Sequence, residues 1–234
     1  MQIHSEPTYE SVSDAILERL FEIGVLTSKP EATPWESFLH LSDLVHERFH
    51  IPGTSFSPMM RRFLFALGRA ANPRSMVGVG TFVGYTFAWL LRDRNDGKSG
   101  PFFEKAIGVD IDPQATSAAE KNCALLGHGD RLQFVTSDGV AAMRDIGHSV
   151  DLLYIDVDDP HRGKLGYCDI LVAALPSLRS GSIVVAHDAC EKQFHSDMKQ
   201  YEQMMRDLGC FAEAVVLPID ACGVSVTVFR GART

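Results

Sequence analysis

"SMVGVGTFVGYTFAWLL", residues 75–91, contains two apolar segments joined by a loop with glycines at positions 78, 80 and 84. The first segment is short and rich in valine, which predicts a buried strand. The second is longer and predicts a helix, so the glycines mark a tight strand-to-helix turn. Such a turn lets a ligand approach the backbone closely, although any tight connection of this kind also favours glycine.

The same order of strand and helix recurs along the rest of the chain. This alternation predicts an α/β fold, a doubly wound and mostly parallel seven-stranded sheet of the Rossmann-like kind. The last two strands have no helix between them, so we expect an antiparallel C-terminal hairpin. The further strands are predicted at 105–111, 132–138, 150–157, 181–188, 211–219 and 223–231, and the further helices at 113–127, 139–146, 166–178 and 194–209.

The N-terminal part is predicted to be helical. Apolar residues lie near one helical face of segment 10–26, and a proline-containing linker at 28–34 precedes a second helix at 35–49. Ser57 and Pro58 have the residue types that favour the N-cap and the first helical position of a third helix within 55–71. We expect residues 1–54 to form a helical extension, a lid or a dimer surface, and residues 55–234 to form the main domain.

Composition limits the possible functions. The 234 residues carry a net charge of -8, whereas nucleic-acid binders usually show a basic stripe. No run of about 18 apolar residues is present, so we expect no membrane span. The first thirty residues are too charged for a signal peptide, and the five cysteines form no C-x-x-C pair. We therefore expect a cytoplasmic protein with reduced thiols that binds neither nucleic acid nor membrane.

The predicted strand ends indicate where a ligand binds. In an open parallel sheet the ligand lies at the carboxyl ends of the strands, and here four of the first five strands run into an aspartate. The glycine loop has the spacing G-x-G-x-x-x-G, one residue off the dinucleotide fingerprint. Asp110 follows Gly84 by 26 residues and ends the next strand, where a carboxylate accepts hydrogen bonds from ribose hydroxyls. Together these features favour a nucleoside cofactor.

Five ordered motifs carry a family resemblance over about residues 55–230. They are MVGVGTFVGYTFAWLL, AIGVDIDPQATSAAEKNCALLG, RLQFVTSDGVAAM, VDLLYIDVDD and LPSLRSGSIVVAHDA, and a closing LPIDACGVSVTVFR follows them. The segment resembles class I S-adenosylmethionine-dependent methyltransferases, and is most similar to the catechol and caffeoyl-CoA O-methyltransferase group. The resemblance implies S-adenosylmethionine as cofactor, bound by residues among Gly78, Gly80, Thr81, Phe82, Tyr85, Asp110, Ile111, Ser137, Asp138, Gly139 and Asp156.

The resemblance also implies a role for several of these positions. Gly80 and the turn up to Tyr85 would line the methionine part of the cofactor. Asp110 would hold the ribose, Asp138 with its two neighbours would face the adenine, and Asp156 would lie beside the sulfonium and the substrate. Gly78 departs from the group, which has a glutamate there that helps to hold the cofactor's amino group.

Metal assistance is a further implication of the resemblance. The group holds a divalent metal through aspartates and an asparagine, and the matching positions here are Asp156, His187 and Asp188. An imidazole in the set shifts the preference from Mg toward metals such as Mn or Fe. We therefore expect methylation of a small-molecule hydroxyl with divalent-metal assistance, in a protein that forms a homodimer.

Several alternatives stay open. The site could lack a metal, with His187 or His161 as the general base of an N- or O-methyltransferase. Where this chain has Asp159, the group has a lysine that can act as a base. The loop that follows is about five residues longer in this chain. Asp158, Asp159, His161 and Lys164 could each reach the site. An NAD-dependent dehydrogenase and a non-catalytic cofactor-binding subunit are the more distant alternatives.

Overall fold

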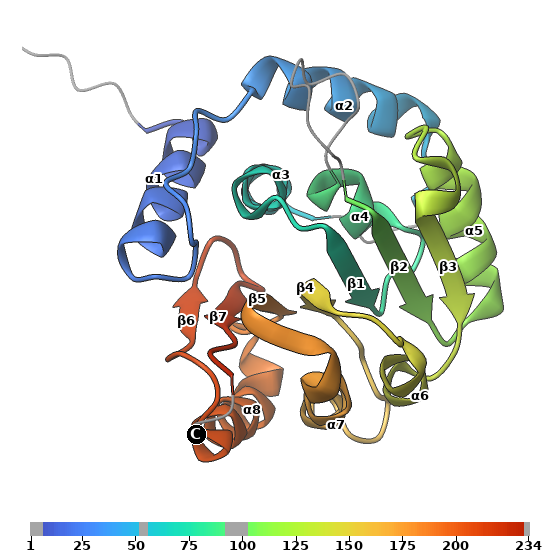
Figure 1. Cartoon of the computed structure of the whole chain (residues 1–234). Coiled ribbons are helices and arrows are strands. Elements are labelled where there is room, and N and C mark those ends of the chain that lie inside the picture. Colours follow the sequence, from blue (N-terminus) through green and yellow to red (C-terminus); the bar gives the residue numbers. More distant parts are fainter. Residues whose placement is uncertain (1–6, 52–55, 92–102, 232–234) are drawn as a thin grey trace, which may run out of the picture.

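The computed structural model describes residues 7–51, 56–91 and 103–231. Its sheet contains seven strands in the order β3-β2-β1-β4-β5-β7-β6, and Figure 1 shows helices on both faces. The strands are β1 (Ser75–Val79), β2 (Lys105–Asp110), β3 (Leu132–Thr136), β4 (Val150–Ile155), β5 (Leu178–His187), β6 (Val215–Leu217) and β7 (Val224–Val228). The helices are α1 (Tyr9–Glu22), α2 (Trp35–Arg48), α3 (Pro58–Ala71), α4 (Tyr85–Leu90), α5 (Pro113–Ala124), α6 (Gly139–Asp145), α7 (Gly166–Ala174) and α8 (His195–Leu208).

The strand directions confirm the predicted sheet. Strands β1 to β5 are mutually parallel, whereas β7 is antiparallel to both β5 and β6. Strand β6 is shorter than the predicted 211–219, because Pro218 ends it and Phe211 forms only an isolated bridge to Phe229. The strand order reverses between β1 and β4, and a reversal of this kind opens a crevice at the carboxyl ends of the two strands.

The core is divided by the sheet into two layers. Helices α1 to α5 lie on one side in Figure 1, and α6, α7 and α8 on the other. Each side has its own hydrophobic cluster: Trp89 and Phe63 belong to the first, and Tyr167 and Tyr201 to the second. Strands β1 and β4 are buried along nearly their whole length, as parallel strands covered on both faces must be.

The N-terminal helices are continuous with the first of these clusters. Leu17 and Leu20 of α1 and Phe38 of α2 are almost fully buried in it, and α1 packs against α3. Helix α3 begins where the sequence predicted, since the Ser57 hydroxyl accepts a hydrogen bond from the Met60 amide at 3.0 Å. Within the described residues, none of the helices combines the length and the apolarity needed to cross a membrane.

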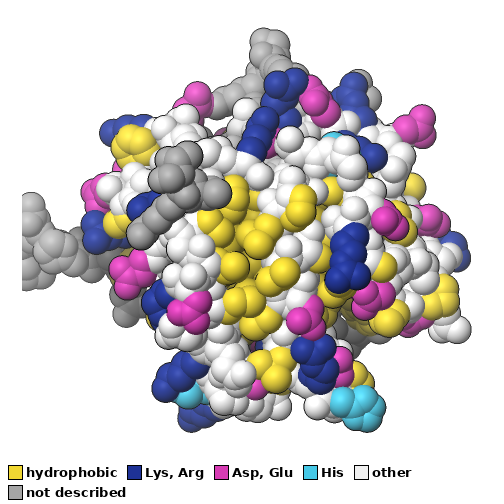
Figure 2. All heavy atoms as spheres, turned by 60° about the horizontal axis from the view of Figure 1, so that its bottom comes forward, with side chains coloured by type: hydrophobic (Ala, Val, Ile, Leu, Met, Phe, Trp, Pro, Cys, Tyr) yellow, Lys and Arg dark blue, Asp and Glu magenta, His cyan; other side chains and the backbone are white. Residues whose placement is uncertain are grey.

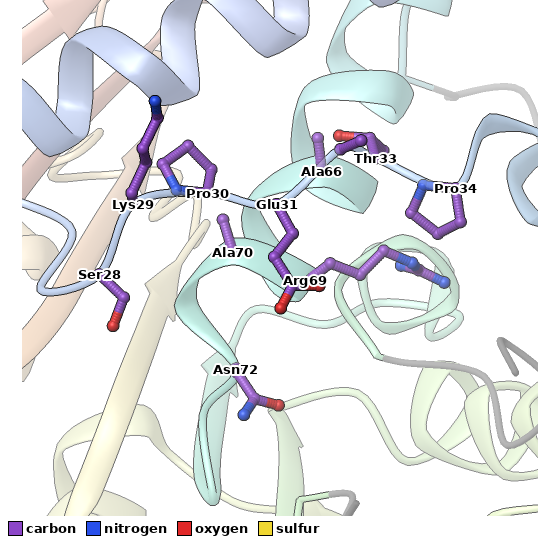
Figure 3. Close-up of a pocket in the computed structure, with 11 residues that line it drawn as sticks. Ser28, Lys29, Pro30, Glu31, Thr33, Pro34, Ala66, Arg69, Ala70 and Asn72 are labelled. Atoms are coloured by element: carbon purple, nitrogen blue, oxygen red, sulfur yellow. The ribbon is translucent and has the colours of Figure 1, made fainter. Parts of the chain in front are cut away.

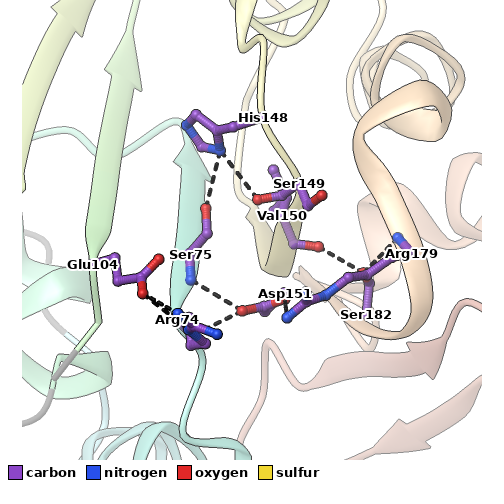
Figure 4. A network of polar contacts seen from close by, with 9 residues as sticks. All are labelled: Arg74, Ser75, Glu104, His148, Ser149, Val150, Asp151, Arg179 and Ser182. Atoms are coloured by element: carbon purple, nitrogen blue, oxygen red, sulfur yellow. Dashed lines mark hydrogen bonds and ion pairs between the residues drawn. The ribbon is translucent and has the colours of Figure 1, made fainter. Parts of the chain in front are cut away.

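A polar network ties together the amino ends of the central strands (Figure 4). One carboxylate oxygen of Asp151 in β4 accepts hydrogen bonds from the backbone amides of Arg74 and Ser75, at 2.8 and 3.1 Å. The other oxygen pairs with Arg179 of β5, and Arg74 pairs with Glu104 next to β2. The network fixes the start of four strands and lies at the edge of the sheet opposite to the predicted site.

A small cavity lies between the 28–34 connection and the C-terminal half of α3 (Figure 3). It measures about 260 Å³ and is lined by Ser28, Lys29, Glu31, Arg69 and Asn72, among others. Asn72 ends α3 just before β1 begins, so this cavity also lies near the amino ends of the strands. Its position separates it from the strand ends that carry the predicted chemistry.

The surface carries hydrophobic side chains on one face of the molecule. Figure 2 shows them gathered in the middle of this face, with Lys, Arg, Asp and Glu side chains around them. Contiguous apolar surface is typical of ligand or partner contact. The homodimer that the sequence led us to expect stays a prediction.

Candidate active site

The glycine loop brings the ends of β1, β2 and β4 together. Gly80 has a φ of +82°, and its amide donates to the carbonyl of Val109 at 2.8 Å. A Cβ atom at this position would collide with the carbonyl oxygen of Asp156. Only glycine therefore allows the loop to pass so close to the end of β4 in this conformation.

Asp110 at the end of β2 organises the cofactor side of the predicted site. Its Oδ2 atom accepts a hydrogen bond from the amide of Phe82 at 2.7 Å, and its Oδ1 atom accepts one from the amide of Asp112 at 3.0 Å. Each carboxylate oxygen has two acceptor positions, and the described residues fill one on each, which leaves the other for a ligand hydroxyl. The carboxylate also holds the loop of β1 against the end of β2.

Apolar side chains lie exposed on both sides of this carboxylate. Ile111 is 75% exposed and Phe82 is 42% exposed, although both are large and hydrophobic. A nucleoside combines hydroxyl donors with a flat apolar face. The combination of Asp110 with Phe82 and Ile111 therefore fits the nucleoside part of S-adenosylmethionine, which is the cofactor that the sequence motifs imply.

Gly78 lies inside β1 and faces the core. A Cβ atom there would lie 2.9 Å from Cγ2 of Thr81 and 3.1 Å from the ring of Phe87. These two side chains fill the space that a larger side chain at position 78 would need. The packing around β1 thus accounts for the glycine at this position.

Asp138 follows β3 and begins α6. Its Oδ1 atom accepts hydrogen bonds from the amides of Val140 and Ala141, both at 3.0 Å, which makes it the N-cap of the helix. The Ser137 hydroxyl donates to the carbonyl of Asp138 at 3.1 Å, and Gly139 packs tightly on Val79. Asp138 therefore has a structural role in capping α6 whatever it contributes to cofactor binding.

The residues that were predicted to be reactive meet at the ends of β4 and β5. The Nδ1 atom of His187 lies 3.3 Å from Oδ2 of Asp156 and 3.1 Å from Oδ1 of Asp188. Only 7% of His187 is exposed, and among the described residues neither Nδ1 nor Nε2 makes a hydrogen bond, so the two contacts of Nδ1 are ion-pair distances. Asp188 adopts a φ of +59°, which is unusual for a residue with a side chain and turns its carboxylate back toward His187.

Opposite charges in this cluster shift the pKa values of His187 and Asp188. Burial alone would lower the pKa of His187, but the carboxylates of Asp156 and Asp188 outweigh it and raise that pKa to about 10. Burial alone would raise the pKa of Asp188, but His187 and Lys164 hold it well below its usual range. At neutral pH the imidazole is therefore mainly in its protonated form, which the two carboxylates stabilise.

Lys164 completes the cluster from the loop after β4. Its side chain is 2% exposed, and Nζ lies 2.6 Å from Oδ2 of Asp188 and 3.5 Å from Oδ1 of Asp156. The sequence placed this residue only among four loop candidates. The extra length of the loop was the single feature of the sequence that indicated a role for Lys164. The position of a side chain on a loop does not follow from residue periodicity.

The structure leaves His161 outside this group. Its side chain is exposed, and its backbone amide donates to Oδ1 of Asp159 at 2.8 Å in a turn of the same loop. The arrangement therefore favours His187 over His161 as the base, although both were candidates from sequence.

Aromatic rings enclose the imidazole. Phe56 stacks on Tyr85 with ring centroids 5.6 Å apart and meets His187 edge-on at 5.3 Å. Tyr154 of β4 lies 6.4 Å from His187 in a tilted arrangement. These rings form an apolar wall beside the imidazole and limit the access of water to it.

The donor set for a metal differs from the predicted one. Among the described residues, His187, Asp188 and Cys222 offer ligand atoms that all lie within 4.8 Å of one another. Cys222 was predicted as an ordinary thiol, and nothing in the sequence placed it beside His187. The carboxylates of Asp188 and Asp156 already contact the Lys164 ammonium group, so the residues present do not fit a divalent cation between these carboxylates.

Comparison of the sequence with known proteins shows similarity to methyltransferases. A family model described as a methyltransferase domain matches residues 77–189. A catechol O-methyltransferase from Niastella koreensis is 25% identical over 140 residues, and the match covers 58% of each chain. The chain therefore spans less than two thirds of the length of this relative.

Two solved structures share the fold. An O-methyltransferase from Bacillus cereus in complex with SAH has a TM-score of 0.64 at 17% identity, and the match covers 92% of this chain and 97% of that one. TomG, an O-methyltransferase from Streptomyces achromogenes in complex with SAM, has a TM-score of 0.64 at 14% identity, with 96% and 100% covered. Together with the sequence matches, these findings confirm the predicted relationship to the catechol and caffeoyl-CoA O-methyltransferase group.

Proposed function

We propose that this protein, an S-adenosylmethionine-dependent methyltransferase related to the catechol and caffeoyl-CoA O-methyltransferases, methylates a hydroxyl group of a small molecule. One observation carries the proposal. The Nδ1 atom of the buried His187 imidazole lies within ion-pair distance of two carboxylates, and neither ring nitrogen has a hydrogen-bond partner among the described residues. The neutral form of such an imidazole can accept a proton, so the arrangement supports a role as general base.

The cofactor would bind at the adjoining strand ends. Asp110 would accept hydrogen bonds from the ribose hydroxyls, and the exposed side chains of Phe82 and Ile111 would cover the apolar parts of the nucleoside. The loop at Gly80 would bring the methionine part next to Asp156. S-adenosylmethionine would supply the methyl group on a sulfonium.

The protein's own part in the reaction is to orient the acceptor and remove its proton. Methyl transfer breaks the carbon–sulfur bond, whose electron pair stays on sulfur, and forms a carbon–oxygen bond. The acceptor hydroxyl donates its proton to Nε2 of the neutral form of His187, which is the minor form below the raised pKa of about 10, and Asp156 and Asp188 stabilise the imidazolium that results. Placing the two reacting atoms in line supplies the rest of the acceleration.

Two measurements on the purified protein test this function. Calorimetric titration should show binding of S-adenosylmethionine and no binding of NADH, which would count against a dehydrogenase. Transfer of a labelled methyl group to a panel of hydroxyl and amine compounds should favour the hydroxyl compounds. Binding without transfer to any acceptor would overturn the enzymatic proposal and favour a non-catalytic cofactor-binding subunit.

A further inference from the structure

We propose that the ammonium group of Lys164 occupies the cation position between Asp156 and Asp188, so that methyl transfer by this protein needs no divalent metal. This inference rests on the proposed methyl transfer. It concerns the carboxylates that the sequence assigned to a metal, and it assigns their counterion to the chain itself.

Three oxygen atoms surround the ammonium group. Nζ of Lys164 lies 2.6 Å from Oδ2 of Asp188, donates to the carbonyl oxygen of Val157 at 2.9 Å, and lies 3.5 Å from Oδ1 of Asp156. An ammonium group has three donors, and these three oxygens match them in number. The acceptors are two carboxylates and a backbone carbonyl, the same oxygen types that bind hard divalent cations.

The surroundings of the lysine favour a permanent place in the site. Only 2% of its side chain is exposed, and Nζ lies 5.3 Å from the ring centroid of Tyr167 and 5.0 Å from that of Phe194. Both rings interact favourably with a cation at such distances. A lysine is almost never buried to this extent without paired charges, and here two carboxylates provide them.

The loop is built to deliver this side chain. The Lys164 amide donates to Oδ2 of Asp197 in α8 at 3.0 Å, and Oδ1 of Asp159 accepts from the amides of His161 and Arg162 in the turn before it. Gly163 has a φ of +56°, and a Cβ atom there would collide with the same oxygen of Asp197. The additional loop residues thus form an ordered turn that brings the lysine into the site.

The charge balance argues against a metal in addition to the lysine. Two carboxylates face one ammonium group and one imidazole. A divalent cation on the same oxygens would lie next to the ammonium group, and like charges at such short range repel strongly in a buried site. Lys164 is therefore a positioning residue: it holds Asp188 and Asp156, and these hold His187.

A consequence for the substrate follows. A bound metal would position two adjacent oxygens of an acceptor, whereas a lysine already surrounded by protein oxygens has no donor left for a second one. Without a metal to bind both oxygens, a vicinal diol or catechol has no advantage over the corresponding monohydroxy compound.

The test is a titration of the protein with Mn²⁺, in which electron paramagnetic resonance measures the concentration of the free ion. The wild-type protein should leave the free-ion signal unchanged up to millimolar Mn²⁺. The variant Lys164→Ala should gain one Mn²⁺ site, and its affinity for Mn²⁺ should be at least tenfold higher than that of the wild-type protein. The double variant Lys164→Ala with Asp188→Asn should lose this site again. Lys199→Ala, which changes an exposed lysine of α8, is the matched control and should behave as the wild type.

Each result decides the proposal. A stoichiometric Mn²⁺ site in the wild-type protein that is lost in Asp156→Asn would overturn it, and so would a Lys164→Ala variant that folds but gains no site. If Lys164→Ala does not fold, the wild-type titration alone decides. Failure of the proposed function would look different: the wild-type protein would then bind no S-adenosylmethionine in calorimetry, whatever the Mn²⁺ titration shows.

Discussion

The Nζ atom of Lys164 lies 2.6 Å from Oδ2 of Asp188, and this ion pair joins the loop after β4 to the end of β5. It connects the two strand ends that carry the reactive side chains. Removing one partner of a buried ion pair leaves an uncompensated charge, which is why such a pair is sensitive to truncation. The stability of the site and its chemistry thus depend on the same contact.

We expect Lys164→Ala to lower the free energy of unfolding by about 3–5 kcal/mol, because the Asp188 carboxylate would lose its closest cation in a buried site. Adding Asp188→Asn should recover part of this loss. Urea unfolding of the wild type, both single variants and the double variant measures the coupling. Strictly additive losses would contradict a direct interaction between the two side chains.

We expect His187→Gln to lower kcat by about 10²–10⁴-fold and to leave the Kd of S-adenosylmethionine nearly unchanged, because only the proton acceptor is lost. Steady-state kinetics and calorimetry measure the two quantities. The same substitution at His161 distinguishes the two candidate bases. An equal loss of kcat in His161→Gln would contradict the assignment of His187.

The stability contributed by His187 should depend on pH. The folded-state pKa of about 10 lies above the unfolded value of about 6.5. The contribution is therefore fully present below about pH 6.5 and is lost as the pH rises through 10. Urea unfolding of wild type and His187→Gln at intervals across this window should show a difference that shrinks toward alkaline pH. A difference in unfolding free energy that stays constant or grows toward alkaline pH would contradict this expectation.

Gly80 and Gly127 offer a matched pair of substitutions. Both have a positive φ, but a Cβ atom at Gly127 meets nothing within 4 Å, whereas at Gly80 it collides with the carbonyl oxygen of Asp156. We expect Gly127→Ala to cost about 1 kcal/mol and Gly80→Ala more than about 3 kcal/mol of unfolding free energy. Chemical denaturation measures both. Similar losses of unfolding free energy in the two variants would mean that the close approach of the loop to β4 does not contribute to stability.

Asp110→Ala should weaken S-adenosylmethionine binding by about 10–100-fold, because hydrogen bonds to a charged group contribute about 1.5–3 kcal/mol. Asp112 lies two residues away and caps α5 through the amide of Gln114, at 2.8 Å. Asp112→Ala should therefore cost about 1 kcal/mol of stability and leave the Kd unchanged. Calorimetry with both variants separates the two roles, and an equal loss of affinity would contradict the ribose contact.

Much of the fold could be predicted from sequence because local patterns determine it. The alternation of strand and helix gave the parallel sheet, and Ser57 with Pro58 gave the start of α3. The meeting of Asp156, His187 and Asp188 also followed, since the carboxyl ends of neighbouring parallel strands lie at one edge.

The remaining features depend on contacts that no local pattern records. The place of Lys164 is set by the loop turn at Asp159 and by Asp197 of α8, which lies 33 residues further along the chain. Cys222 reaches His187 only because β7 inserts between β5 and β6. For this reason the sequence could propose a metal at the carboxylates but could not show that the Lys164 ammonium group contacts the same carboxylates.

The most direct test of the account is methyl transfer by protein that has been stripped of metals with a chelator. Labelled S-adenosylmethionine and a set of monohydroxy acceptors would be supplied to the wild type and to His187→Gln in parallel. We predict that transfer by the wild type persists in the presence of the chelator and is lost in the variant. Transfer that appears only after a divalent cation is added back would contradict the account.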